Sequence, residues 1–163
     1  HFSQSCRDLN FVLEQPCDSY EELKAITPNI CHPLYLDESA SDIATVAKAI
    51  NEGIADGFGM KVTRVGGVSA MRSIIDICHT YRRPLSCDDS WGGDIVAAAC
   101  VHLASIVEPS LSRGAWIAAP YIDKPYDRLN SVQVSGGWID IPKGPGLGIV
   151  PDTSMFNLYQ SFS

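Results

Sequence analysis

Five apolar segments of this sequence each end in a residue that can take part in chemistry. These residues are Glu14, Asp37, Lys61, Asp88 and Trp116. Successive members lie 23 to 28 residues apart, which is room for one strand followed by one helix. Because parallel strands of such a repeat present their carboxyl ends on one side of the sheet, the spacing predicts that all five side chains meet at one site.

The two acidic members, Glu14 and Asp37, end apolar strands where a packing residue would otherwise be expected. Two carboxylates at one barrel mouth suit a hard cation such as Mg²⁺, which takes oxygen ligands and keeps some of its water. The alternative is that both are helix caps or solvated turn residues, since Asp and Glu are common where a strand leads into a helix.

Lys61 lies between Met60 and Val62 in an apolar strand. Partial burial and a nearby metal ion both disfavour the ammonium form, so a lysine in this position can serve as a general base. The alternative is a surface lysine on an exposed strand face.

Asp88 and Trp116 end the next two strands. A carboxylate beside an indole can bind a substituted ammonium through charge pairing and cation–π attraction. The neighbouring Asp89 is a further candidate for substrate binding. The alternatives are a capping role for either aspartate and a tryptophan that only packs.

The segments between these residues predict alternating strands and helices. Strands are expected near 10–13, 34–36, 59–62, 84–87 and 115–118, and helices over 20–27, 40–51, 69–79 and 94–105. We expect Ile43, Val46, Ala47 and Ile50 to face inward from the second helix, and Met71, Ile74, Ile75 and Cys78 from the third. The pattern indicates an α/β fold of parallel βα units, as a barrel rather than a doubly wound sheet.

The end of the chain has a different character. A hairpin is predicted across Gly136-Gly137, and the segment 142–148, rich in glycine and proline, interrupts regular structure. We therefore divide the chain into a partial barrel over 1–130 and an extension over 131–163 that packs on another domain.

Composition excludes several classes of protein. The 163 residues carry a formal net charge of −7, with 45% hydrophobic and 19% charged residues, and this acidic balance argues against a surface for nucleic acid or anionic membrane. No apolar run is long enough to span a bilayer. The six cysteines lack close pairs, which favours free thiols in a reducing compartment over disulfides or zinc. A soluble, cytoplasmic protein is expected.

Short motifs across nearly the whole chain resemble the enolase superfamily, specifically its mandelate racemase/muconate lactonizing enzyme group. In sequence order they are Leu13-Glu14-Gln15-Pro16, Leu36-Asp37-Glu38-Ser39, Met60-Lys61-Val62-Thr63-Arg64-Val65-Gly66-Gly67, Asp89-Ser90-Trp91-Gly92-Gly93-Asp94-Ile95, His102-Leu103-Ala104 and Gly144-Pro145-Gly146-Leu147-Gly148. The Lys-x-x-Arg-x-Gly-Gly and Glu-Gln-Pro segments are specific in combination.

The resemblance implies the C-terminal half of a modified (β/α)7β TIM-type barrel, with a tail that returns to an α+β capping domain. It implies that Glu14 and Asp37 are the second and third ligands of Mg²⁺ or another divalent cation, with Glu38 beside them. Lys61 would be the acid/base on one face of the α-carbon of a carboxylate substrate. Asp88 and Trp116 match positions that bind the ammonium in members acting on proline betaines and hydroxyprolines, which include 2-epimerases and cis-3-hydroxyproline dehydratases.

Members of this group are more than twice as long as this chain. The capping domain, the first metal ligand and the base for the opposite face lie in the part without a counterpart here. We therefore expect a piece of a longer enzyme, completed by its N-terminal half or a complementary chain and assembled as a homo-oligomer. The alternative is a non-catalytic half-barrel module that assembles with itself or a companion chain.

Overall fold

A computed structural model of the chain describes residues 1–156. Its five main strands form one parallel sheet and stand side by side in their sequence order. They are β1 (Leu13–Glu14), β2 (Leu34–Leu36), β3 (Gly57–Lys61), β4 (Leu85–Asp88) and β5 (Ser112–Trp116). A doubly wound sheet reverses its strand order in the middle, whereas the strands of a barrel follow one another without reversal. The order therefore confirms the α/β class and favours the barrel.

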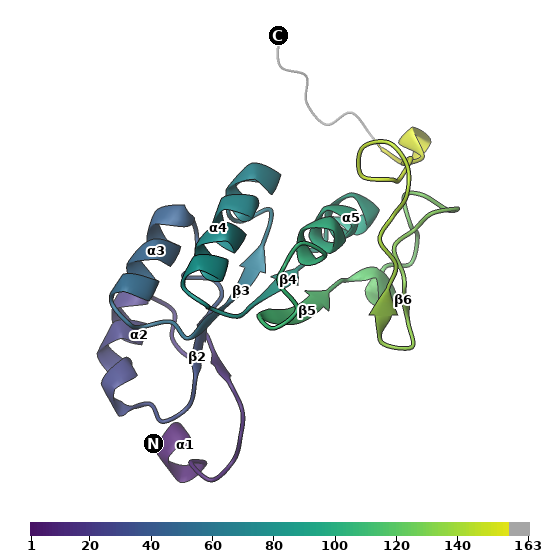
Figure 1. Cartoon of the computed structure of the whole chain (residues 1–163). Coiled ribbons are helices and arrows are strands. Elements are labelled where there is room, and N and C mark those ends of the chain that lie inside the picture. The colour runs from purple at the N-terminus through teal and green to yellow at the C-terminus, as the bar shows by residue number, and fades with distance from the viewer. Residues whose placement is uncertain (157–163) are drawn as a thin grey trace.

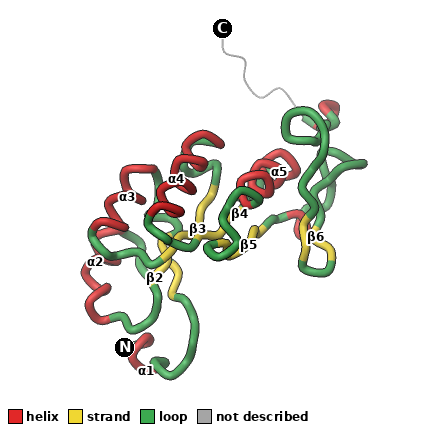
Figure 2. Tube along the Cα trace, viewed as in Figure 1, coloured by secondary structure: helices red, strands yellow, loops and turns green. Residues whose placement is uncertain are grey.

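One helix connects each strand to the next, and Figure 1 shows these helices following one another along one face of the sheet. After α1 (Phe2–Ser5), they are α2 (Tyr20–Ile26), α3 (Ile43–Asn51), α4 (Val68–Thr80) and α5 (Gly93–Ala104). Short 3₁₀ helices cover Thr27–Asn29, Ala119–Tyr121 and Thr153–Met155. The alternation of strand and helix, coloured in Figure 2, is the repeat that the sequence predicts.

The core lies between the sheet and its helices. Alternate strand residues, such as Phe58 and Met60 of β3 and Leu85 and Cys87 of β4, are buried. Because the side chains of a strand alternate between its two faces, the residues between them point to the opposite face. Lys61 and Asp88 belong to this second set and are only half-buried.

The helix faces agree with the predicted pattern in α4 but not in α3. All four expected residues of α4 are buried: Met71, Ile74, Ile75 and Cys78. In α3 the buried residues are Val46, Ala49 and Ile50, while Ile43 and Ala47 are exposed. The helix begins at Ile43, directly after its N-cap Asp42, whose carboxylate accepts from the Thr45 amide at 2.7 Å. Ile43 therefore lies in the first turn at the helix end, outside the packed stripe.

The tail begins with the predicted hairpin, in which β6 (Val134–Ser135) pairs antiparallel with β7 (Trp138–Ile139). Val132 is buried in the barrel core, and Ile139, Leu147 and Ile149 pack against that core. The described part of the tail therefore lies on the barrel itself. Residues 157–163 of the predicted extension lie outside the described residues, and the division at 130 and the docking on a capping domain stay predictions.

Two buried aspartates attach this tail to α5. Asp94, at the start of α5, accepts from the Asp127 amide at 3.0 Å and from the Ser131 hydroxyl at 2.6 Å. Asp127 in turn accepts from the Val150 amide at 2.7 Å and from the Asn130 amide at 3.0 Å. These hydrogen bonds hold the pKa of Asp127 at about 2. Three segments that are distant in sequence are thereby joined through these two carboxylates.

All six cysteines have free thiols, as predicted. Burial raises the pKa of Cys78 and of Cys87 to about 12, so both remain protonated near neutral pH. Within residues 1–156, none of the helices is both long and apolar enough to cross a membrane.

Candidate active site at the carboxyl ends of the strands

The carboxyl ends of the five parallel strands surround one open cavity of about 530 Å³. Its lining contains the five strand-end residues that the sequence singles out, Glu14, Asp37, Lys61, Asp88 and Trp116, and also Asp89. Three further lining residues were not singled out: Ser86, Ser90 and Trp91. The register explains this convergence, because Lys61 pairs with Asp88 and Asp88 with Trp116 across neighbouring strands. The structure thus brings the predicted residues together.

Gly59 makes room for the carboxylates in this cavity. A Cβ atom at Gly59 would lie 2.5 Å from Oε1 of Glu14, 3.4 Å from Oδ2 of Asp88 and 3.5 Å from Cβ of Asp37. Three acidic side chains therefore approach the same point of β3, and only a residue without a side chain leaves that point open.

Asp37 is almost fully buried and is the most heavily contacted acid of the site. Its Oδ2 accepts from the ammonium of Lys61, and its Oδ1 accepts from Nη1 of Arg64 at 2.5 Å. Arg64 also donates to the carbonyls of Gly59 at 2.8 Å and Ala40 at 3.3 Å. One guanidinium thus connects β3, the end of β2 and the turn that follows β2.

Gln15 orders the other side of that turn. Its Oε1 accepts from the backbone amides of Asp37 at 3.0 Å and Ser39 at 3.2 Å, while its Nε2 donates to the Ser39 hydroxyl at 2.7 Å. Its backbone has a φ of 38°, in the left-handed region that is uncommon outside glycine. Since it directly follows Glu14, this residue couples the ends of β1 and β2.

The carboxyl group of Glu14 is influenced by its acidic neighbours. Its pKa is raised, first by partial burial and then by the negative charges of Asp37 and Asp88. Glu38 adds a smaller effect of the same sign, although Glu38 is exposed and is not among the residues lining the cavity. This concentration of negative charge favours a bound cation.

Asp88 lies beside Trp116, one of the two tryptophans that line the cavity. It is half-buried, and burial raises the pKa of its carboxyl group, although the Ser86 hydroxyl donates to Oδ2 at 3.0 Å. Trp116, on the neighbouring strand, keeps 42% of its surface exposed. A carboxylate and an accessible indole therefore stand next to each other, as the sequence predicts.

Asp89 has a different environment from Asp88. It is 1% exposed, and its Oδ2 accepts from the Ala118 amide at 3.0 Å. Its Oδ1 is buried without a hydrogen-bond partner in the part of the chain that is described. The observed contact anchors the segment after β5, while substrate binding by Asp89 stays a prediction.

Two carboxylates of this chain are candidates for holding a metal ion. No group of three or more histidine, cysteine, aspartate or glutamate side chains arranged to hold a metal occurs among residues 1–156. Glu14 and Asp37 come from neighbouring strands and both line the cavity, so they can supply two oxygen ligands.

Besides Ser86 and Ser90, three residues of the site escaped prediction from the sequence: Gln15, Arg64 and Trp91. Each lies within three residues of a predicted residue, in a motif that was recognised, yet none is the residue that ends a strand. Their contacts reach across to other strands, and local sequence patterns do not predict distances between strands.

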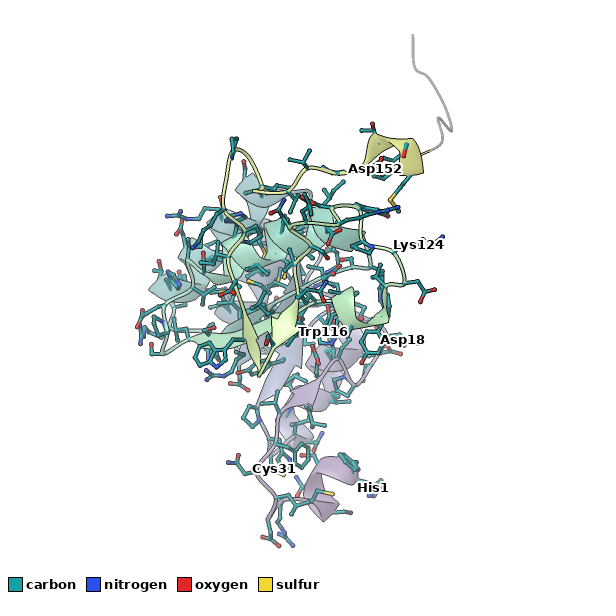
Figure 3. The ribbon with its side chains drawn as sticks, turned by 90° about the vertical axis from the view of Figure 1, so that its right-hand side faces the viewer. His1, Asp18, Cys31, Trp116, Lys124 and Asp152 are labelled. Atoms are coloured by element: carbon teal, nitrogen blue, oxygen red, sulfur yellow. The ribbon has the colours of Figure 1, made fainter. Side chains whose placement is uncertain are left out.

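Figure 3 shows Trp116 in the middle of the molecule, while Cys31 lies beside the N-terminus at the lower end, well away from this site.

Comparison with known proteins agrees with this description. The sequence profile of the family described as "Enolase C-terminal domain-like" matches residues 2–155. A cis-3-hydroxy-L-proline dehydratase from Roseibium aggregatum is 31% identical over 150 residues, and the match covers 88% of this chain and 39% of the relative. An N-succinylamino acid racemase from Amycolatopsis sp is 32% identical over 142 residues, covering 86% of this chain and 38% of the relative. The chain thus spans about two fifths of the length of these relatives.

Solved structures share the fold. A mandelate racemase/muconate lactonizing enzyme from Roseovarius nubinhibens superposes with a TM-score of 0.88 at 29% identity, covering 96% of this chain and 42% of that one. Another structure from the same organism, described as a putative mandelate racemase/muconate lactonizing enzyme complexed with magnesium, gives a TM-score of 0.84 at 29% identity, covering 90% of this chain and 40% of that one. These matches identify the parallel sheet and its helices as part of a barrel. The chain belongs to the enolase superfamily, as the C-terminal domain of its mandelate racemase/muconate lactonizing enzyme group.

Proposed function

We propose that this chain supplies one side of an active site that removes the proton next to a substrate carboxylate with the help of a divalent cation. The observation that carries the proposal is the joint presence of Glu14, Asp37 and Lys61 in one cavity at the strand ends. Acids that can hold a cation and an amine that can exchange a proton are the two components this chemistry needs.

Glu14 and Asp37 would hold the cation, with Glu38 beside them and a third ligand from outside this chain. The donor set fits Mg²⁺, because both ligands are carboxylates and the surrounding acids raise the pKa of Glu14, which a bound cation would counteract. When bound, the cation would balance the charge of the substrate carboxylate and make the neighbouring C–H group more acidic.

Lys61 would exchange the α-proton at Nζ on one face of the substrate. Its side chain is 25% exposed and therefore reaches the cavity, while its ion pair with Asp37 fixes its direction. The base for the opposite face would lie in the part of the complete protein that this chain does not span.

The proposed substrate is an amino-acid-derived carboxylate such as a hydroxyproline or proline betaine. Asp88 and Trp116 would receive its ammonium group, and Asp89 would lie behind them in the same wall. The dehydratase relative is named for a hydroxyproline and the racemase relative for an N-succinylamino acid. Racemisation, epimerisation and dehydration all begin with the same removal of the α-proton.

The proposed partner is the remainder of the barrel. β1 and β5 are the two edges of the sheet, and within residues 1–156 each pairs with one neighbouring strand. Unpaired edge groups of a parallel sheet are costly to leave uncovered, and closure into a barrel removes both edges. We also propose that the complete protein assembles as a homo-oligomer.

The test is α-proton exchange with deuterium from solvent, measured by NMR in the complete protein with Mg²⁺ and proline betaine. Lys61→Ala should abolish exchange on one face of the substrate, while Lys124→Ala, which removes a lysine that does not line the cavity, should leave exchange intact. Exchange on both faces at the wild-type rate in the Lys61→Ala variant would contradict the assigned role.

A further inference from the structure

Three aromatic side chains meet at one side of the cavity and remain open to solvent. Trp91, Trp116 and Tyr121 are 59%, 42% and 67% exposed. The two indoles lie with centroids 5.7 Å apart and planes at 64°, and Tyr121 contacts both, at 5.8 Å from Trp91 and 6.3 Å from Trp116. We call these three residues the aromatic corner. Large exposed aromatic groups gathered in this way mark a binding surface.

Trp91 is held in this corner by a strained backbone. Its φ is 64°, in the left-handed region that a bulky residue rarely adopts. Residues in this conformation are destabilising and persist only where the surroundings impose the conformation. The surroundings of Trp91 must therefore impose its conformation, and the position of its side chain is a candidate for a functional role.

The structural cause is the fixation of the loop on both sides of Trp91. The Asp89 amide donates to the Trp116 carbonyl at 2.9 Å, and the Thr63 hydroxyl donates to the Ser90 hydroxyl at 2.6 Å. On the other side, Gly93 lies so close to the ring of Tyr126 that a Cβ atom would be 2.4 Å from it. With both flanks fixed, Trp91 cannot relax without breaking these contacts.

Packing in the core does not account for the position of the Trp91 side chain, since most of its surface is exposed. Trp91 lines the cavity beside Asp88 and Trp116, whereas Tyr121 is outside the set of lining residues. A substrate whose carboxylate lies toward Glu14 and Asp37 would therefore place its nitrogen end against two indoles and one carboxylate.

We propose that Trp91 is a specificity-determining residue, which makes the site prefer substrates whose ammonium carries alkyl groups over the same amino acid without them. This inference rests on the proposed function and names its substrate class more closely. The C–H groups beside a quaternary nitrogen carry part of its charge and are attracted to indole faces, whereas an N–H group requires an oxygen acceptor, which Asp88 supplies and Trp91 does not. Trp91 would thus add more affinity for the alkylated form than for the form that carries N–H groups.

The test compares N,N-dimethylproline with proline in the complete protein, with binding measured by calorimetry and α-proton exchange by NMR. Trp91→Asn should weaken binding and exchange of N,N-dimethylproline by about tenfold relative to proline. Because asparagine tolerates a positive φ, the same variant should unfold at a temperature equal to or above that of the wild type, which excludes misfolding as the cause. Trp91→Phe should retain most of the preference.

Tyr81→Ala is the matched control, since it removes an exposed ring that lies outside the aromatic corner and does not line the cavity, and it should leave the ratio unchanged. Equal losses for both ligands in Trp91→Asn, or a change of the ratio in Tyr81→Ala as large as that in Trp91→Asn, would overturn the inference. Binding of N,N-dimethylproline that depends on Trp91, without any α-proton exchange in the wild type, would support the inference and refute the proposed function. Exchange that shows no dependence on Trp91 would refute the inference alone.

Discussion

Lys61 and Asp37 form an ion pair across the ends of the neighbouring strands β3 and β2. The proposed proton-transfer group is thereby joined to a proposed metal ligand, and Arg64 holds the same carboxylate from its other oxygen. The proposed proton transfer and the proposed metal binding would therefore share one buried acid, and the groups around that acid give the first predictions.

Replacing Arg64 by lysine keeps the charge but removes the planar group that contacts Asp37, Gly59 and Ala40 at once. We expect the complete protein to lose about 2 kcal/mol of unfolding free energy, measured in urea, because buried carbonyls lose their donors. Arg72→Lys is the control, since Arg72 pairs with Asp76 on the exposed side of α4, and it should change stability by less than about 0.5 kcal/mol. Equal losses of unfolding free energy in the two variants would contradict the conclusion that Arg64 connects these segments.

Glu14→Gln should lower Mg²⁺ affinity of the complete protein by tenfold or more, on the order of the loss expected when a group around a metal is removed. Calorimetric titration measures this directly. Glu38→Gln should have a smaller effect, because Glu38 is exposed and does not line the cavity. If Glu38→Gln proves the more damaging change, then Glu38 and not Glu14 is the ligand.

Gly59→Ala tests whether Gly59 is needed for the cavity or for the packing of the core. The added methyl group would lie 2.5 Å from Oε1 of Glu14, and that flexible carboxylate can move away without disturbing the core. We expect weaker Mg²⁺ binding and slower α-proton exchange, with a thermal unfolding midpoint close to that of the wild type. A large drop in the midpoint together with unaltered Mg²⁺ affinity would show that the position serves packing.

Trp116→Leu should weaken the binding of proline betaine more than it weakens the binding of a sugar acid, which carries no positive charge. The loss for the betaine is expected to be about threefold to thirtyfold, in line with cation–π energies of about 0.5–2 kcal/mol. Competition against α-proton exchange in the complete protein gives both affinities. Equal losses for the two ligands would reduce Trp116 to a packing residue.

Asp127→Asn should remove a pH-dependent part of the stability. The pKa of Asp127 is about 2 in the folded chain, below the value of about 3.9 for an unfolded aspartate. A depressed folded pKa contributes stability that is complete above about pH 5 and is lost as the pH falls through 4 toward 2. The variant should therefore be less stable than the wild type at pH 6, and the difference should shrink by pH 2.5 in urea unfolding. Asp140→Asn, at an exposed position of the same tail, should show no such convergence.

The periodicity of the sequence was sufficient to find the five strands and the residues at their ends, although it placed the first strand at 10–13 and the fifth at 115–118, where the structure has Leu13–Glu14 and Ser112–Trp116. Glu14, Asp37, Lys61, Asp88 and Trp116 could be named in advance because each βα unit returns the chain to the same side of the sheet. The buried face of α4 followed for the same reason, since a helical repeat of apolar residues depends only on local geometry.

Contacts between distant segments could not be predicted in this way. The three hydrogen bonds of Arg64, the clearance at Gly59 and the strained loop at Trp91 depend on how side chains of different strands approach one another. In α3 it is Ala49 that is buried, where Ala47 was expected, because burial also depends on where the helix begins and how it packs along its neighbours. Sequence periodicity determined which residues reach the cavity, and tertiary packing decided which of them touch, because distances across strands are set only when the strands pair.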